Sequence, residues 1–204
     1  MPAFLLRRLL RASASRLTST GELRPFRLAL DEFRTVSICP DDRLHLLVPY
    51  SREHAAVIAS WVGSAQELFH LAPSTEPPLT AHKVRNWPRP GGVAMTYCDS
   101  HGEPTAYGEI NPMRNDALHY WLGHIIVAPA LRGAGLGSRF MSALFDVAYT
   151  DLSARRISLV VFPENMAACR CYERVGMSCC GEEFHRFVSD GPRHRLLRYE
   201  RSFG

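Results

Sequence analysis

Residues 122–177 read LGHIIVAPALRGAGLGSRFMSALFDVAYTDLSARRISLVVFPENMAACRCYERVGM, and this stretch contains the patterns that decide the fold. An apolar run at 125–127 has the composition of a buried strand and ends at a proline. A glycine-rich turn at 132–137 follows and leads into apolar residues at helical spacing. A second apolar run at 157–162 leads into another helical pattern at 165–176. Strand, turn, helix, strand and helix in this order predict an α/β arrangement.

The turn at 132–137 has the properties of a phosphate-binding site. Glycine at positions 133, 135 and 137 leaves out the side chains that would keep a ligand away from the backbone. The first N–H groups of the following helix lack intrahelical acceptors, and the helix dipole favours an anion beside them. Arg132 adds a positive charge. The turn is not a Walker loop, because the chain's one lysine is Lys83, and its glycine spacing is not that of a dinucleotide fingerprint.

The turn is also the first half of a two-part motif. The first part reads V-x-P-x-x-R-G-x-G-x-G and the second reads N-x-x-A-x-x-x-Y-x-x-x-G. The matching residues are Val127, Pro129, Arg132, Gly133, Gly135 and Gly137, then Asn165, Ala168, Tyr172 and Gly176. This pair of motifs resembles the GNAT superfamily of acyl-CoA-dependent N-acyltransferases. The resemblance covers the middle of the chain closely, and residues 44–203 fit it in the order of their elements.

The rest of the chain predicts further strands and helices around this central stretch. Strands are expected at 43–48, 92–98, 104–110, 119–127, 157–162, 183–189 and 194–201, and helices at 51–61, at 64–71, after the glycine turn and at 165–175, with a helical turn at 80–87. We therefore expect an α/β (α+β) fold with a mixed sheet of six or seven strands flanked by helices. The order β-α-α-β-β-β-α-β-α-β-β is also what the GNAT resemblance implies.

Composition limits the classes of protein that fit. The chain has 204 residues, 46% of them hydrophobic and 22% charged, which is ordinary for one globular domain. The net charge of +4 is mild and the basic residues are dispersed, so no nucleic-acid partner is expected. No apolar stretch approaches about 18 residues, so no membrane-spanning helix is expected. The six cysteines form no CxxC pair and no zinc spacing with histidine, so we expect free thiols and no metal site.

Residues 1–40 are expected to form an N-terminal extension, flexible in part, before a single domain at 41–204. Residues 1–21 contain four arginines, several serines and no acidic residue, which is typical of a mitochondrial transit peptide. The alternative is a disordered leader in an arginine-rich proteome. The cytoplasm is the expected location, with the mitochondrial matrix as the alternative if residues 1–21 are a transit peptide.

The GNAT resemblance implies acetyl-CoA as cosubstrate and places it residue by residue. The expected cofactor-binding residues are Ile125, Ile126, Val127, Arg132, Gly133, Ala134, Gly135, Leu136, Gly137, Ser138, Asn165 and Tyr172. The turn and Ser138 would bind the pyrophosphate, and the backbone at 125–127 would pair with the pantetheine arm. A backbone N–H of Ile126 or Val127 would polarise the thioester carbonyl.

The resemblance also places Tyr172 at the position of the general acid. A phenol with a reference pKa of about 10 suits protonation of a departing thiolate. The alternative is a packing residue, since Tyr172 lies at helical spacing from Ala168 and Gly176. Asn165 would contact the cofactor or a bridging water, and it also fits a helix N-cap.

Three residues are candidates for the general base. Strand 119–127 contains no acidic residue, which departs from the branches of the family that have a glutamate there. Glu109 lies on the neighbouring strand, where it faces either the acceptor or solvent. His119 and His124 have a side chain suited to the task, although strand histidines are more often packed and hydrogen-bonded residues.

The acceptor is the least defined part of the site. The stretches that build acceptor pockets in the family carry aromatic and histidine residues, Trp61, Phe69, His70, Trp87, Phe184, His185 and Phe187, which fit a plain core equally well. No acidic cluster is present to attract polyamines, aminoglycosides or histone tails, so the expected partner is a small-molecule or peptide amine. The function that the GNAT resemblance implies is transfer of an acetyl group from acetyl-CoA to a primary amine of a small molecule, an amino acid or a protein N-terminus by direct attack. A non-catalytic acyl-CoA-binding regulatory module is the alternative function. The oligomeric state stays open, with a homodimer as one option.

Overall fold

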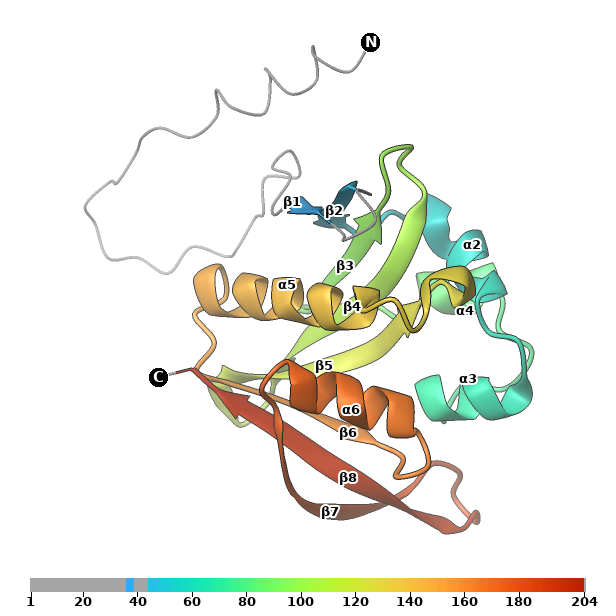
Figure 1. Cartoon of the computed structure of the whole chain (residues 1–204). Coiled ribbons are helices and arrows are strands. Elements are labelled where there is room, and N and C mark those ends of the chain that lie inside the picture. Colours follow the sequence, from blue (N-terminus) through green and yellow to red (C-terminus); the bar gives the residue numbers. More distant parts are fainter. Residues whose placement is uncertain (1–35, 39–43, 204) are drawn as a thin grey trace. The chain divides into compact units, whose positions relative to one another are not determined.

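The computed structural model describes residues 36–38 and 44–203, which form one mixed sheet covered by helices (Figure 1). The strands are β1 (Val36–Ile38), β2 (Leu44–Pro49), β3 (Val93–Cys98), β4 (Pro104–Met113), β5 (Asp116–Val127), β6 (Arg156–Val161), β7 (Ser178–Arg186) and β8 (Arg193–Ser202). The α-helices are α2 (Ala55–Ser60), α3 (Ala65–Leu71), α4 (Ala81–Arg85), α5 (Leu136–Thr150) and α6 (Met166–Arg174), and short 3-10 helices η1 (Arg52–His54) and η2 (Pro129–Leu131) precede α2 and the glycine turn.

The eight strands lie in the order β1-β2-β3-β4-β5-β6-β8-β7. All neighbouring pairs are antiparallel except β5 and β6, which are parallel. The expected α/β sheet is confirmed, with seven strands of six residues or more and the short β1 beside them. Strand β1 falls within the range expected to be an extension, and the leader expected at 1–21 lies outside the described residues.

Three of the described α-helices begin at residues whose side chains cap free N–H groups. Ser64 precedes α3 and accepts a hydrogen bond from the N–H of Glu67, and Thr80 precedes α4 and accepts one from the N–H of Lys83. Asn165 caps α6 in the same way through the N–H of Ala168. These bonds satisfy donors that a helix start leaves unpaired. Local sequence therefore sets the start of three helices that surround the site.

Two hydrophobic clusters lie on opposite faces of the central strands. The first contains Phe140 and Leu144 of α5, Tyr172 of α6 and the side chains of Ala106 and Ile110 in β4. The second contains residues of α2, α3 and α4 together with Tyr107 of β4 and Ile126 of β5. Because successive side chains of a strand point to opposite faces, the sheet has α5 and α6 on one face and α2 to α4 on the other.

Strands β5 and β6 diverge shortly after they meet. Among the described residues their pairing runs over His119–Trp121 and Arg156–Ser158, although β5 continues to Val127 and β6 to Val161. The second half of β5 thus keeps β4 as its neighbour on one side and has an open edge on the other. We call this divergence of β5 and β6 the opening.

No helix in the described part of the chain is both long enough and apolar enough to cross a membrane.

Candidate active site

The glycine turn exposes backbone at the start of α5. Gly133 and Gly135 have φ angles of +80° and +81°, and a Cβ at either position would have no atom within 4 Å. Gly135 is the N-cap of α5 and offers no side-chain acceptor to the first N–H groups of the helix. Because those N–H groups need an external partner, the turn has the free donors and the open space that a pyrophosphate requires.

Gly137 and Ser138 bring the start of α5 against α6. A Cβ on Gly137 would lie 3.5 Å from the Sγ of Cys171 and 3.7 Å from Cγ2 of Val127. The hydroxyl of Ser138 lies 3.5 Å from the same thiol. The turn, the end of β5 and α6 therefore meet at one place.

The open edge of β5 presents the backbone of Val127. The N–H of Ala128 donates to the carbonyl of Thr105 in β4 at 2.9 Å. Because alternate residues of an antiparallel strand face the partner strand, the backbone groups of Ile126 face β4 and those of Val127 face the side where β6 has diverged. Of the two expected donors to the thioester carbonyl, Val127 is the one on the open side.

Arg132 is directed away from the free N–H groups of the turn. Its Nε donates to the carbonyl of Val127 at 2.9 Å and an Nη donates to the carbonyl of Trp61 at 3.0 Å. Its other Nη lies 2.6 Å from Oε1 of Glu67 in α3. These contacts tie the loop before α5 to α2 and α3, so the side chain positions the helices on the other face of the sheet.

Tyr172 lies on α6, packed in the cluster beneath α5. Its side chain is 8% exposed and its ring centroid is 5.9 Å from that of Tyr199. Burial raises the pKa of Tyr172 well above its ordinary value, with smaller contributions from Cys171 and Cys169. The phenol therefore keeps its proton at any neutral pH, which a general acid requires. Asn165 acts as the N-cap of α6, so that alternative is confirmed.

Glu109 is buried within a set of hydrogen bonds on the face of α2 to α4. It is 1% exposed, which excludes the solvent-facing alternative. The hydroxyl of Tyr107 donates to Oε1 at 2.7 Å, the amide of Asn111 donates to Oε2 at 3.3 Å, and Nδ1 of His124 lies 2.8 Å from Oε1. Burial alone would raise the pKa of Glu109, but the hydrogen bonds from His124, Tyr107 and Asn111 lower it below its ordinary value. The carboxylate is therefore ionised.

A bulge in β5 turns His124 toward Glu109. The pairing of β4 with β5 shifts between Tyr107 and Glu109, where β5 contains one residue more than β4. His124 has a φ of +50°, a conformation that is uncommon for residues other than glycine. Its ring stacks on that of Trp87 with centroids 4.3 Å apart and planes 8° apart. In the neutral tautomer whose Nδ1–H donates to the carboxylate, the lone pair is on Nε2.

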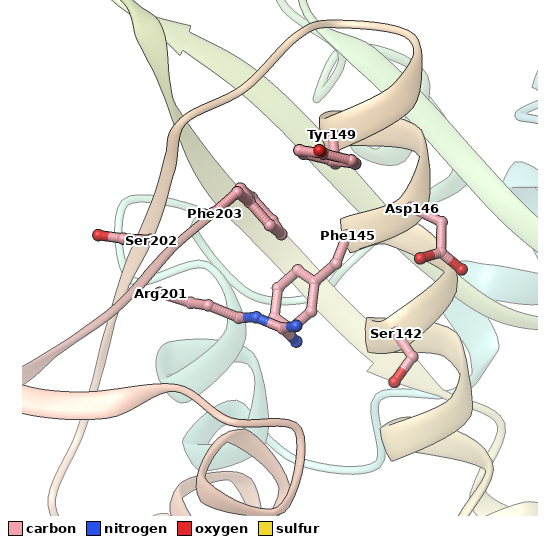
Figure 2. A pocket seen from close by; sticks show the side chains of 7 residues that line it. All are labelled: Ser142, Phe145, Asp146, Tyr149, Arg201, Ser202 and Phe203. Atoms are coloured by element: carbon pink, nitrogen blue, oxygen red, sulfur yellow. The ribbon is translucent and has the colours of Figure 1, made fainter.

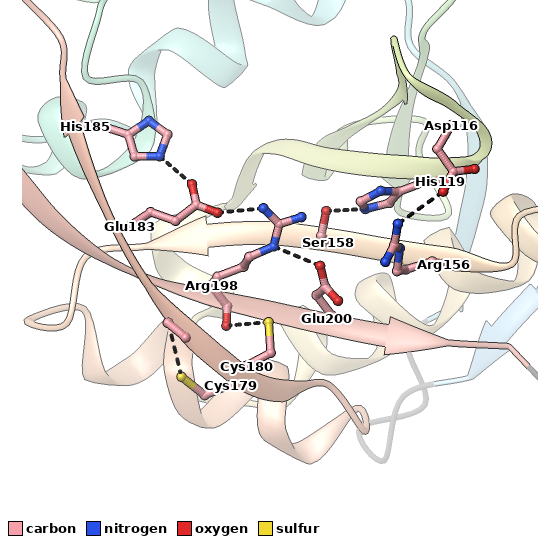
Figure 3. Close-up of polar contacts among 11 residues, drawn as sticks. Asp116, His119, Arg156, Ser158, Cys179, Cys180, Glu183, His185, Arg198 and Glu200 are labelled. Carbon is pink, nitrogen blue, oxygen red and sulfur yellow. Dashed lines mark hydrogen bonds and ion pairs between the residues drawn. The ribbon is translucent and has the colours of Figure 1, made fainter.

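His119 lies apart from this set. It is 4% exposed, and its Nε2 lies 2.6 Å from the hydroxyl of Ser158 in β6 (Figure 3). Desolvation lowers the pKa of His119, and the nearby Arg156 lowers it further. Beside it, Arg198 of β8 contacts Glu183 of β7 and Glu200 of β8 (Figure 3). The structure thus brings Glu109 and His124 together and leaves His119 with Ser158.

A surface pocket of 400 Å³ lies elsewhere, between the second half of α5 and the end of β8 (Figure 2). Arg201 lies over the rings of Phe145 and Phe203 there, at 4.9 Å and 5.5 Å from the centroids. The first residue of α5 that lines the pocket is Ser142, which comes after the glycine turn in the chain. The pocket contains none of the residues expected to bind the cofactor.

Several residues of the site were not expected from the sequence. Tyr107 and Asn111 share the face of Glu109 because they lie two positions before and after it in β4, and this alternation was the available signal. Trp87 was expected only as an acceptor-side aromatic, without its stacking on His124. Phe162 and His194 join Phe69, and no local pattern indicated that contact.

Comparison with known proteins places this geometry in a family. The sequence profile described as "Acetyltransferase (GNAT) family" matches residues 55–177. Spermidine N(1)-acetyltransferase of Escherichia coli (strain K12) is 32% identical over 74 residues, which make up 36% of this chain and 40% of that protein. The match thus spans about two fifths of the relative.

Solved structures share the fold at low sequence identity. An acetyltransferase (GNAT family) from Bacillus anthracis superimposes with a TM-score of 0.66 at 15% identity, covering 83% of this chain and 98% of that one. Spermidine N-acetyltransferase from Vibrio cholerae, in complex with CoA and spermine, superimposes with a TM-score of 0.63 at 18% identity, covering 78% and 95%. The profile extends from the start of α2 to Met177, three residues after α6, so the chain belongs to the GNAT acetyltransferase family.

Proposed function

We propose that this protein transfers an acetyl group from acetyl-CoA to the primary amine of a small molecule, an amino acid or a protein N-terminus by direct attack. The observation that carries the proposal is the open edge of β5. It has the uncapped glycine turn and Tyr172 on one face of the sheet and the Glu109–His124 pair on the other. A thioester held along this edge would be accessible to an acceptor from the opposite face.

The binding of the cosubstrate would rest on backbone groups. The N–H groups at residues 136–138, with the open space beside Gly133 and Gly135, suit the pyrophosphate. The open edge of β5 suits an extended pantetheine arm, and the N–H of Val127 is oriented to donate to the thioester carbonyl oxygen. The solved structure of a fold relative in complex with CoA supports this choice of ligand.

The reaction requires two proton transfers. The amine nitrogen forms a bond to the thioester carbonyl carbon and loses a proton, the C–S bond breaks, and the sulfur leaves with a proton. We assign the first proton to Nε2 of His124, whose Nδ1–H is held by the ionised Glu109. We assign the second to the hydroxyl of Tyr172, which stays protonated because burial raises its pKa. Glu109 fixes the tautomer and orientation of His124, as a carboxylate does in other histidine-based catalysts.

The proposal is tested by thiol release from acetyl-CoA against a panel of amines, amino acids and N-terminal peptides, beside a direct titration with CoA. Turnover with one class of acceptor, together with binding of CoA, is the expected result. Binding of CoA without turnover across the panel would favour the regulatory module instead. The absence of CoA binding would overturn both functions.

A further inference from the structure

Five side chains from four segments form a partly exposed aromatic cluster on the acceptor side of the sheet. They are Phe69 and His70 of α3, Phe162 directly after β6, Phe187 directly after β7, and His194 of β8. Phe69 is central, with ring centroids 5.0 Å from Phe162, 4.9 Å from His194 and 5.9 Å from Phe187. We call these five residues the aromatic wall.

The aromatic wall lies where an acceptor would approach. Phe162 follows the end of β6, the strand that diverges from β5 and leaves the opening in the sheet. Helix α3 carries Phe69 and lies against β5, and its Glu67 is tied to Arg132 beside the glycine turn. Phe162 is 6% exposed, whereas Phe69, Phe187 and the two histidines keep part of their surface in contact with solvent. A plain core would bury all five, so a partly exposed aromatic surface beside the opening points to a ligand.

Three carboxylates around the aromatic wall have cationic partners. Glu67 pairs with Arg132, Glu183 pairs with Arg198 and with His185, and Glu182 pairs with Arg195 (Figure 3 shows the contacts of Glu183). A polyamine needs several free carboxylates for its separate charges, and these side chains have cationic partners instead.

We infer that the acceptor is a monoamine whose amino group is attached to an aromatic body, such as an arylalkylamine, and that the aromatic wall binds that body. This inference rests on the proposed function and specifies its acceptor. Aromatic rings recognise a flat apolar group by offset and edge contacts at centroid distances like those within the wall. The amino group, bound at the other end of the ligand, would then face His124 through the opening.

The test compares 2-phenylethylamine with spermidine, in turnover with acetyl-CoA and in calorimetric binding to the protein saturated with CoA. Two variants are compared, Phe187→Ala in the wall and Tyr149→Ala on α5, whose 53% exposed ring contacts Phe203 instead. We expect kcat/KM at least about tenfold higher for 2-phenylethylamine than for spermidine. Phe187→Ala should lower the value for the aromatic amine about tenfold, mainly through KM. Tyr149→Ala should leave it unchanged, and neither variant should change the KM for acetyl-CoA.

The possible outcomes distinguish failure of this inference from failure of the proposed acetyltransferase function. Turnover that favours spermidine, or equal effects of the two alanine variants, would overturn the aromatic acceptor and leave the acetyltransferase. Selective binding of 2-phenylethylamine without turnover would support the aromatic wall and overturn the proposed function. If the protein neither binds nor turns over the aromatic amine, the inference is overturned.

Discussion

At the scale of single residues, His124 can be removed without disturbing the backbone around it. His124→Gly keeps a residue that adopts a φ of +50° without strain, and it leaves a space beside Trp87 and Glu109 of the size of the lost ring. We expect kcat/KM for the amine to fall about a hundredfold and to recover in part when free imidazole is added. The measurement is thiol release at increasing imidazole concentrations.

The matched control for this rescue is Ser158→Ala, which removes the partner of His119 on the same side of the sheet. Its activity should stay near that of the wild type and should not respond to imidazole. Activity of His124→Gly at the level of the wild type would exclude His124 as the base.

Tyr172 is tested at the same scale, as the residue proposed to donate a proton to the leaving sulfur. Tyr172→Phe keeps the ring that packs against Tyr199 and removes only the hydroxyl. We expect kcat to fall about a hundredfold or more, while the dissociation constant for CoA in a direct titration stays the same. An equal loss in CoA affinity would mean that the hydroxyl binds the cosubstrate and does not serve as the acid.

At the scale of elements, the glycine turn can be tested against a second turn that has a glycine with a similar φ angle. Gly135 has a φ of +81° and Gly102 a φ of +85°, and a Cβ at either would have no atom within 4 Å. Alanine in this conformation costs about 1–2 kcal/mol, so both variants should lose similar stability in chemical unfolding. Only Gly135→Ala should weaken CoA binding, by about tenfold, because only its Cβ enters the space assigned to the pyrophosphate. Similar CoA affinities for the two variants would contradict the assignment of the turn.

The elements also show which parts of the fold the sequence predicts. Ser64 and Thr80 were predictable because a cap is a local property of a few consecutive residues. Strand β7 was expected from 183 but begins at Ser178, because its first residues are exposed and carry no alternation of apolar and polar side chains. The bulge at His124 was not predictable, since a positive φ is uncommon for any residue except glycine and the bulge depends on pairing with β4. The aromatic wall depends likewise on contacts between distant segments.

At the scale of the whole molecule, the buried Glu109 links stability to pH. Its pKa is lowered in the folded protein, so its contribution is present above the unfolded value of about 4.3 and is lost as pH falls through the folded value. The lowered pKa of His119 acts in the same direction below about 6.5. We expect urea unfolding to show a free energy that decreases from pH 7 toward pH 3, with a smaller decrease in Glu109→Gln. A variant with the same pH dependence as the wild type would mean that Glu109 is not the ionised group described above.

The most direct measurement is mass spectrometry of an acceptor amine incubated with acetyl-CoA and the protein, with released thiol quantified in the same sample. Direct transfer predicts one acetylated amine for each thiol released, and no acetylated protein as an intermediate. Thiol release without acetylated amine would show hydrolysis alone, and it would contradict an active site in which the open edge of β5 presents the thioester to the acceptor.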